Sequence, residues 1–565
     1  MPIYQVQGGG ESAAITGVLT LRGVVVGDYE GARPALRGFY LQAAEGDGDP
    51  ATSDAIFVFN GDNDDVEVGD LVTVSGRVAE FQGQTQLSAS SVTVCGIGSV
   101  KPVDVFLPVA DDDFLERFEG MLVRLPQTLH VTEQYQLGRF GEVVLSLGAR
   151  LPQPTAVAEP GPASAAVLRA NELSSLVLDD EANDQNPAVI RFGRGGRPLS
   201  AANTLRGGDA VSGLVGVLTF TWAGNAASGN TWRLRPSGAS GTYAPVFESA
   251  NPRPPVPDVG GTLRVASLNV LNYFTTLGSR GASDQLELER QRAKLVATLL
   301  ELDADVVGLV ELENRQAALA DLVATLNEAV GRSDYAAVTT GPLGTDVITV
   351  GLIYRRTSVA PAGDYAVLDD AFDPSFRDHH NRPVLAQTFV DAQGRALTVA
   401  VVHLKSKGSD CLDVGDRDTG DGQGNCNITR TQAAAVLARW LATDPTGAED
   451  SDQLVLGDFN AYRREDPVVV LETAGFVSLL HEFHGDSAYT FAFDGMWGAL
   501  DHAFASPALL GQITGVAAWH VNADEPSVLD YNVEFKSLSQ LEELYTPDPY
   551  RASDHDPLLI GIELR

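Results

Sequence analysis

A proline-rich segment divides this chain of 565 residues into two regions with different hydrophobic patterns. Residues 251–261 read NPRPPVPDVGG, and the four prolines in this run fix φ and remove backbone donors. The segment is therefore extended and cannot belong to a helix or a central strand. A chain of this length also exceeds what one hydrophobic core normally holds. The sequence predicts a multidomain protein with a linker at residues 251–261.

The region before the linker has an all-β pattern. From Ile15 to Leu87, strand-like runs such as ITGVLTLRGVVVGDY, AIFVFN and DLVTVSGRVAEF alternate with clusters of Gly, Asp and Asn. The stretch from about Val103 to Phe247 repeats this style with GMLVRL, EVVLSL and GLVGVLTFTW. These patterns predict two N-terminal all-β domains, barrels or sandwiches, at residues 1–100 and 101–250.

After the linker, apolar strands alternate with helical stretches. LRVASLNVLNYF is followed by QLELERQRAKLVATLLEL, then by DADVVGLVELE and ENRQAALADLVATLNEAV. This alternation is typical of an α/β domain whose sheets are covered by helices, and we place it at residues 262–565.

The charge balance limits how the protein can meet its partners. Acidic residues outnumber basic ones 75 to 39, which gives a formal net charge of -36. Such a charge repels nucleic acid and membrane surfaces at long range, so any contact with nucleic acid must be local. Solubility is the ordinary explanation of this acidity. No segment reaches the roughly 18 uninterrupted apolar residues of a membrane-spanning helix.

Polar residues occur where several strands of the α/β region end. Asn269 lies in SLNV, Glu311 in LVELEN, His403 in VVHLKSK, and Asp458 and Asn460 in GDFN. Each has an ordinary structural explanation when it is taken alone, because Asn and Asp favour turns. Strand ends are also where scaffolds present reactive groups. Their joint occurrence therefore predicts a catalytic site.

The order of motifs LNVLNYF, VELEN, NRPV, HLKSK, GDFN, LDHAF and SDHDP resembles the endonuclease/exonuclease/phosphatase family, which includes DNase I-like enzymes. The resemblance spans Gly261 to Arg565 and implies a four-layer α/β sandwich of two mixed sheets with helices outside. VQGGGESAAITG, VTVSGRVAEF and GQTQLS, near the N-terminus, look like the OB-fold-like module of bacterial extracellular nucleases.

The resemblance implies a divalent metal site. Glu311 corresponds to the family's metal-binding glutamate, in preference to Glu313, with Asn269 and Asp554 nearby. Mg²⁺ or Mn²⁺ suits these oxygen ligands, because Mg²⁺ keeps several waters and needs only one or two carboxylates.

The same resemblance assigns the remaining roles. His403, Asn460 and Arg382 would contact the substrate phosphate, where cationic and neutral donors offset growing negative charge. His555 held by Asp501 is the leading general base, and Asp458 is its rival. The expected products are a 5′-phosphate and a 3′-hydroxyl. Some family members orient the first histidine with a Glu, and we expect Asp346 to substitute for it. Six basic residues beside the motifs, which are ordinary solvated charges in the alternative reading, are candidates for a basic rim: Arg355, Arg356, Lys405, Lys407, Arg463 and Arg464.

A Gly/Asp-rich loop follows HLKSK. Cys411 and Cys426 flank it, and we weigh a disulfide between them against two unpaired thiols. Its crowded carboxylates make Ca²⁺ a possible ligand, although their spacing is not that of an EF-hand, and a surface loop without metal is the alternative. The carboxylates belong to Asp410, Asp413, Asp416, Asp418 and Asp421.

Together these features predict a secreted or cell-surface metal-dependent nuclease that cleaves DNA and possibly RNA. The chain opens on IYQV, which looks like a strand in progress, so we expect a trimmed leader. The alternatives are a phosphatase or phospholipase of the same superfamily, or a nucleic-acid-binding surface protein with an inactive catalytic domain. No protein partner is implied. Aromatic candidates for nucleic-acid binding by the front domain are Tyr29, Phe39, Tyr40, Phe57, Phe59 and Phe81.

Overall fold

Two structural units make up residues 1–236 and 244–565, which are the residues described by the computed structural model. The first unit contains Met1–Leu151, Ala170–Pro252 and Phe535–Leu544, and the second contains Pro152–Arg169, Arg253–Glu534 and Tyr545–Arg565. Two segments, Pro152–Arg169 and Phe535–Leu544, therefore belong to a different unit from the one that contiguous domains would give them. Thr155 Oγ1 donates to Glu465 Oε1 at 2.6 Å within the second unit, and Gln540 Nε2 donates to the Pro187 carbonyl at 3.0 Å within the first.

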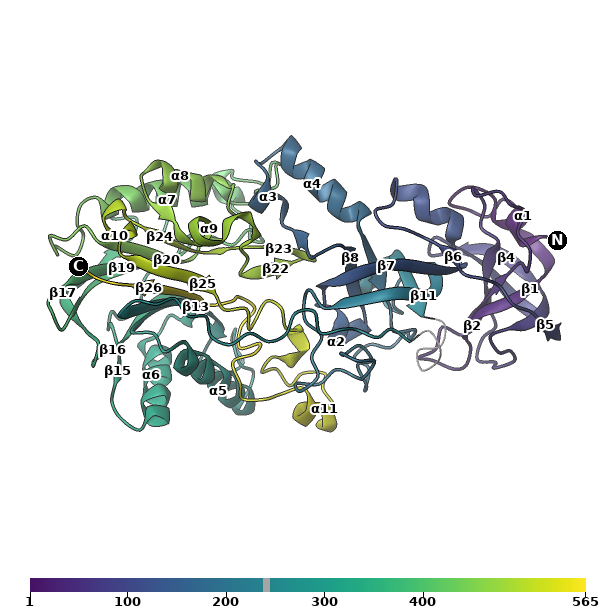
Figure 1. The fold of residues 1–565 in the computed structure, drawn as a ribbon, viewed down its shortest axis with the longest axis horizontal. Coiled ribbons are helices and arrows are strands. Elements are labelled where there is room, and N and C mark those ends of the chain that lie inside the picture. Colours follow the sequence, from purple (N-terminus) through teal and green to yellow (C-terminus); the bar gives the residue numbers. More distant parts are fainter. Residues whose placement is uncertain (237–243) are drawn as a thin grey trace. The chain divides into compact units, whose positions relative to one another are not determined.

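A closed β-barrel forms the N-terminal part of the first unit (Figure 1). Its strand order is β1-β2-β3-β5-β4, and β3 pairs with β5 in parallel. Residues expected to begin a strand form the short helix α1 (Ile3–Gln7) instead, because Ile3 and Val6 fall on one helical face and are buried in the barrel core. The barrel strands are β1 (Gly17–Tyr29), β2 (Gly38–Gln42), β3 (Ala55–Phe59), β4 (Asp70–Phe81) and β5 (Gln84–Ile97).

The rest of the first unit is built on a six-stranded sheet of order β11-β12-β10-β8-β7-β6, in which β11 also pairs with β7. Two arginines of β12 are buried with carboxylates: Arg233 Nη1 lies 2.7 Å from Asp179 and also bonds Glu142, and Arg235 lies 2.9 Å from Asp179. Pairing of this kind is what permits buried charge. The strands are β6 (Val103–Asp104), β7 (Leu122–Glu133), β8 (Val143–Leu147), β10 (Ser175–Leu178), β11 (Ala210–Thr221) and β12 (Thr231–Pro236).

The second unit contains two six-stranded sheets, ordered β15-β16-β14-β13-β26-β25 and β17-β18-β19-β20-β24-β21. The strands of the first sheet are β15 (Tyr335–Ala337), β16 (Ile348–Arg355), β14 (Val306–Glu313), β13 (Leu263–Tyr273), β26 (Leu558–Ile562) and β25 (Ile513–Ala518). Those of the second sheet are β17 (Val359–Leu368), β18 (Val384–Asp391), β19 (Ala396–His403), β20 (Gln453–Asp458), β24 (Asp501–Ala505) and β21 (Val477–Ser478).

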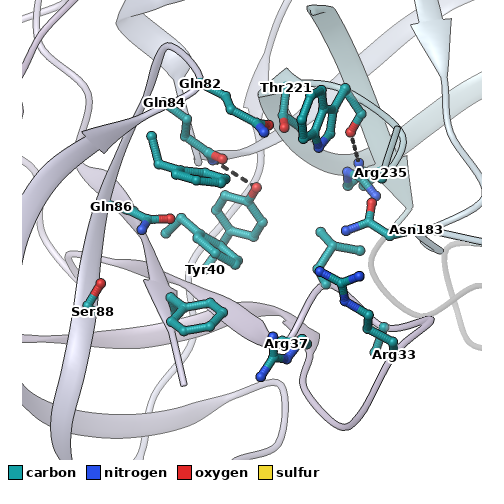
Figure 2. A pocket seen from close by; sticks show the side chains of 17 residues that line it. Arg33, Arg37, Tyr40, Gln82, Gln84, Gln86, Ser88, Asn183, Thr221 and Arg235 are labelled. Atoms are coloured by element: carbon teal, nitrogen blue, oxygen red, sulfur yellow. Dashed lines mark hydrogen bonds between the residues drawn. The ribbon is translucent and has the colours of Figure 1, made fainter. Parts of the chain in front are cut away.

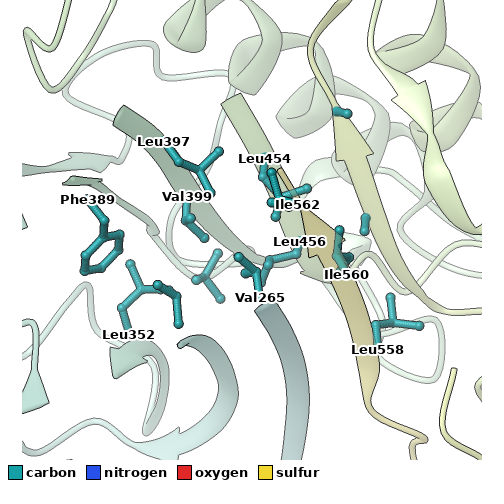
Figure 3. Close-up of a cluster of buried hydrophobic side chains, with 14 of the residues drawn as sticks. Val265, Leu352, Phe389, Leu397, Val399, Leu454, Leu456, Leu558, Ile560 and Ile562 are labelled. Carbon is teal, nitrogen blue, oxygen red and sulfur yellow. The ribbon is translucent and has the colours of Figure 1, made fainter. Parts of the chain in front are cut away.

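These sheets pack face to face across an apolar core. Val265 and Ile560 from one sheet meet Val399 and Leu456 from the other, and all four are fully buried (Figure 3). Helices α5 (Gln285–Leu302) and α6 (Gln316–Val330) cover the outer face of the first sheet. Helices α7 (Asn427–Leu441) and α8 (Asp466–Thr473) cover that of the second. The predicted four-layer α/β sandwich is therefore present, and its two sheets bring distant strand ends to one edge.

Among the described residues, no helix is both long enough and apolar enough to cross a membrane.

Candidate active site

Three of the predicted site residues form one row across neighbouring strands. His403 pairs in register with Asp458 between β19 and β20, and Asp458 pairs with Asp501 between β20 and β24. Residues directly opposite each other on paired strands project to the same face of a sheet. The second sheet therefore presents a histidine and two carboxylates side by side, and all three are buried.

Glu311 comes from the other sheet and lies at a β-bulge. The register of β14 with β16 shifts between Val310 and Leu312, and Glu311 has a φ of 67°. A positive φ is costly for a residue with a Cβ, and such strain gathers at functional sites. The bulge turns the carboxylate toward the end of β13, where Asn272 N donates to Glu311 Oε2 at 3.0 Å.

The structure shows that Glu311 and Glu313 have different roles. The Glu313 carboxylate accepts hydrogen bonds from the backbone and hydroxyl groups of Thr275 and Thr276. Burial alone would raise the pKa of Glu313, but these hydrogen bonds lower it below its usual value. Glu313 therefore anchors the loop after β13, whereas the Glu311 side chain is also available to a ligand.

His555 and Asp501 form the expected pair. His555 Nδ1 donates to Asp501 Oδ2 at 2.7 Å, and the same oxygen accepts from Thr490 Oγ1 at 2.7 Å. Burial alone would lower the pKa of His555, but Asp501, Asp554 and Asp458 raise it well above its usual value. The imidazole is held in place in three ways: by this pair, by Asn522, which donates to the His555 carbonyl at 2.6 Å, and by packing against the Phe491 ring.

Asp458 lies among these groups in a buried setting. Burial raises its pKa to about 7, with a further rise from Asp501, while His555 acts in the opposite direction. Its Oδ1 accepts from the backbone of Asn460 at 2.8 Å, and its Oδ2 lies 3.6 Å from His403 Nε2. Asn460 has a φ of 48° and donates from its side chain to the Leu404 carbonyl at 3.1 Å. One amide hydrogen of Asn460 is left for a substrate.

His403 lacks the acidic partner expected for it. Burial, and secondarily the charge of Arg382, lower its pKa well below the usual value, so the ring is neutral. Its Nδ1 is buried without a hydrogen-bond partner among the described residues. Asp346, predicted to orient this histidine, instead accepts from Arg382 Nε at 3.0 Å. The prediction for Asp346 was wrong because the NRPV arginine lies nearer to its carboxylate.

Arg382 is fixed beside the carboxylates. Its Nη1 donates to the Leu404 carbonyl at 3.0 Å, and the side chain is almost fully buried. Burial lowers its pKa, whereas the charges of Asp346, Glu311 and Asp458 raise it. A buried guanidinium in this position is suited to bind an anion.

The donor set fits a hard divalent cation. Burial, followed by repulsion from Asp554, raises the pKa of Glu311, while His555, Asn269 and Arg382 lower it, so a cation placed between the two carboxylates would relieve their repulsion. Asn269 adds an amide oxygen that already accepts from Leu271 N at 2.9 Å. One or two carboxylates with an amide oxygen are the ligands that Mg²⁺ or Mn²⁺ accepts while keeping several waters. Glu311, Asp554 and Asn269 would hold it.

Most of the residues predicted to form a basic rim pair with carboxylates of the protein instead. Lys407 bonds the buried Glu465, Arg355 pairs with Asp303 at 2.5 Å, and the two arginines after GDFN also pair with carboxylates. Lys405 remains close to Arg382: burial, and secondarily the charge of Arg382, lower the pKa of Lys405. The sequence reasoning missed Arg280. This exposed residue lies in the loop after β13, and its charge acts on both Arg382 and His403.

The Gly/Asp-rich loop is closed by a Cys411–Cys426 disulfide with a Cα separation of 5.4 Å. Asp416 accepts from the first-turn amides of α7, and Asp418 and Asp421 accept from backbone amides of the loop itself. Asp413 instead lies with His379 and His380 in a group spaced to hold a metal ion. Histidine ligands favour transition metals over Ca²⁺.

Several supporting residues carry no motif signal. Thr490, Asn522 and Asp556 hold the loops around His555: Asp556 accepts from Asn522 N at 2.8 Å and from Ala523 N at 3.0 Å. Single polar residues in irregular segments are common in any sequence. Only the proximity of these segments in the fold gives them a role.

Two face-to-face sheets covered by helices, with a buried acid–histidine edge, define a DNase I-like α/β sandwich. Residues 266–555 match the model of the Endonuclease/Exonuclease/phosphatase family, and the chain belongs to this family. Its members are hydrolases that act on phosphoester bonds and typically depend on a divalent metal.

Solved structures similar to the chain include three enzymes. The human Nocturnin catalytic domain is 16% identical, with 54% of this chain and 94% of that chain covered and a TM-score of 0.35. The mannosyl-6-phosphatase of Bacteroides thetaiotaomicron is 15% identical, with 53% and 99% covered and a TM-score of 0.35. A 3′-5′ exonuclease from Neisseria meningitidis is 17% identical, with 53% and 100% covered and a TM-score of 0.34. No curated protein sequence matches the chain.

Proposed function

We propose that the protein is a secreted, metal-dependent nuclease that hydrolyses phosphodiester bonds of DNA, with RNA as a second candidate substrate, to 5′-phosphate and 3′-hydroxyl ends. The observation that carries this proposal is the buried His555–Asp501 pair, 2.7 Å apart, which shares one edge of the sandwich with the carboxylate of Glu311, whose pKa is raised by burial and by Asp554. A base and an electrophilic site at one edge are what hydrolysis of an anionic ester requires.

Each residue has a distinct task in this mechanism. Asp501 fixes the tautomer and orientation of His555, whose Nε2 takes a proton from the attacking water when the ring is neutral. A cation bound beside Asp554 would offset part of the negative charge that raises the pKa of this histidine and so favour the neutral form. Arg382 and the neutral His403 face the phosphoryl oxygens and stabilise charge that grows on them. The free amide hydrogen of Asn460 holds the phosphate in line. The divalent ion, when bound by Glu311, Asn269 and Asp554, supplies charge neutralisation at the scissile phosphate.

Asp458 is a second candidate for the base. Its buried carboxylate lies in the same row as His403 and Asp501, and a pKa of about 7 would let it exchange a proton near neutral pH. In the assignment preferred here, Asp458 positions the water that His555 deprotonates.

Several features favour a nuclease over a phosphomonoesterase or a phospholipase. Arg280 and Lys405 place two further cations beside Arg382, where neighbouring phosphates of a polymer would lie. The barrel of the first unit has a strand order in keeping with an OB-like module, a fold that often binds oligonucleotides. The disulfide in the Gly/Asp-rich loop suits an oxidising compartment, which supports secretion.

One experiment tests the function directly. The purified chain is incubated with supercoiled plasmid, RNA, a phosphorylated sugar and a phospholipid, each with Mg²⁺, Mn²⁺ or EDTA. Metal-dependent loss of supercoils, abolished by Glu311→Gln and His555→Ala, is expected. Glu328→Gln, which changes an exposed glutamate of α6, is the matched control. Hydrolysis of the sugar phosphate or the lipid without cleavage of nucleic acid would overturn the nuclease assignment.

A further inference from the structure

A pocket of about 360 Å³ lies in the first unit, between the barrel and the six-stranded sheet. We propose that this pocket binds one nucleotide of a single-stranded nucleic acid. Its volume falls within the range of about 300–1,000 Å³ found for small-molecule sites. The pocket belongs wholly to the first unit, so this binding site stands whether or not the catalytic centre cleaves nucleic acid.

The wall formed by the barrel is aromatic. Tyr40 on β2 pairs in register with Phe57 on β3, and their ring centroids lie 4.9 Å apart. Phe59 follows on the same face of β3, because alternate residues of a strand share a face. Phe81 at the end of β4 is 55% exposed. Tyr40 and Phe57 are themselves buried and Arg37 lies over the Phe59 ring, so the exposed ring of Phe81 offers the face on which a base can stack, whatever the base is.

Amide side chains line the next part of the pocket (Figure 2). Gln84 and Gln86 project from the same face of β5, and Gln84 Nε2 donates to the Tyr40 hydroxyl at 2.8 Å. Gln82, in the turn before β5, and Asn183, from the second part of the unit, each have a buried amide oxygen without a hydrogen-bond partner among the described residues. Buried acceptors without partners are costly, so a ligand that donates to them gains affinity.

The charged residues that line the pocket are basic, whereas the chain as a whole is acidic. Arg33, Arg37 and Arg235 line the pocket and, within the described residues, no carboxylate does, although the chain carries 75 acidic and 39 basic residues. Arg235 is neutralised by Asp179 at 2.9 Å and Arg37 by Asp62 at 2.7 Å. Arg33 is exposed and has no carboxylate partner in the described part of the chain. It therefore leaves an unbalanced positive charge at the pocket.

These groups are separated in a way that fits a nucleotide. In Figure 2, Arg33 and Arg37 lie toward one end, Gln82 and Gln84 toward the other, and Tyr40 between them. A phosphate at the arginines would place a base over the aromatic rings and its hydrogen-bonding edge at the amides. Duplex bases are stacked and paired, so only a single strand can present a base in this way. A neutral oligosaccharide would use the rings and amides but not the charge of Arg33.

Binding of a short fluorescein-labelled oligothymidylate to the full-length chain in EDTA tests the proposal by fluorescence anisotropy. Arg33→Ala and Phe81→Ala alter exposed side chains and should not disturb folding. Each is expected to weaken binding about tenfold. Arg33→Ala should also reduce the slope of log affinity against log salt by about 0.7, as for one lost phosphate contact to a single strand. Arg22→Ala on β1 and Phe106→Ala are exposed, lie outside the lining and are the matched controls.

The position of the bound strand on the protein is tested separately. A bromouracil-substituted strand is photocrosslinked to the chain, and the crosslinked peptides are identified by mass spectrometry. Crosslinks to Phe57, Phe59, Phe81 or Trp222 are expected. Wild-type affinity in both pocket variants, or crosslinks confined to the second unit, would overturn the proposal. So would competition by an uncharged oligosaccharide but not by thymidine monophosphate. Cleavage assayed with Mg²⁺ reports on the catalytic centre independently, since both pocket variants leave that centre intact.

Discussion

Replacing Asp501 by Asn tests whether this carboxylate activates His555. The two side chains have nearly the same shape, so the change removes a negative charge and leaves the packing of β24 in place. Asp501 Oδ2 accepts from both His555 Nδ1 and Thr490 Oγ1 at 2.7 Å. In Asp501→Asn, only one amide oxygen remains to accept, and the imidazole loses the anion that holds its tautomer.

The size of the effect follows from the distance. At an effective dielectric constant near 20, two unit charges in contact interact by roughly 4–6 kcal/mol. Loss of an energy of this order from the transition state would reduce kcat by about 10³–10⁴, since each 1.4 kcal/mol or so is tenfold. This lies at the upper end of the range of about 10²–10⁴ typical of general acid–base catalysis.

The assay is steady-state cleavage of a fluorogenic oligonucleotide with saturating Mg²⁺, together with thermal unfolding to confirm the fold. We expect kcat to fall by about 10³-fold or more while KM stays within about threefold, because Asp501 acts through His555 and does not touch substrate. Thr490→Val keeps the carboxylate and should cost tenfold or less. A loss below about tenfold in Asp501→Asn would refute the assignment of His555 as base and favour Asp458.

Three further predictions concern charge. Glu311→Gln should abolish Mn²⁺ binding, measured by calorimetry, without loss of thermal stability. Glu313→Gln should keep Mn²⁺ binding but lower the free energy of unfolding by about 1–3 kcal/mol. The reverse pattern would exchange the roles of the two residues. Glu119, whose pKa burial raises from 4.5 to about 8, should stabilise the first unit fully below about pH 4.5 and progressively less as the pH rises to about 8. Urea unfolding of Glu119→Gln should lack this decline, of the order of 5 kcal/mol, and an unchanged decline would contradict it. Arg280→Ala should raise KM about three- to tenfold at constant kcat, with Glu328→Gln as control, and a fall in kcat alone would exclude a role in binding.

The sequence was informative about the site wherever a motif coincides with the end of a regular strand. Asn269, His403 and Asp458 lie at or near such ends and were found from the strand pattern, whereas Asp501, at the start of β24, was assigned through the family resemblance. The two-sheet topology then brings them together, so motif order and element pattern together predict the edge at which they meet. The packing of four layers follows from the same alternation of strands and helices.

Features that depend on long-range contacts could not be predicted from the sequence. The φ of 67° at Glu311 is imposed by the bulge between β14 and β16, and nothing in the residue type encodes it. The partner of Asp346 was mistaken because the sequence does not show that the fold brings Arg382 beside its carboxylate. The pocket of the first unit is lined by residues from several separate segments, so no local sequence pattern predicts it.

The distribution of charge explains how an acidic chain can be suited to an anionic substrate. A net charge of -36 acts over many residues and is screened within about 8 Å at physiological ionic strength. Inside that distance, the groups nearest the substrate decide the interaction, and there Arg382, with Arg280 and Lys405 near it, lies close to the carboxylate of Glu311, which is in turn close to Asp554. A cation held by those two carboxylates would convert the most negative point of the edge into one that attracts phosphate. The proposed dependence on metal would therefore be an electrostatic requirement of this edge as well as a chemical one.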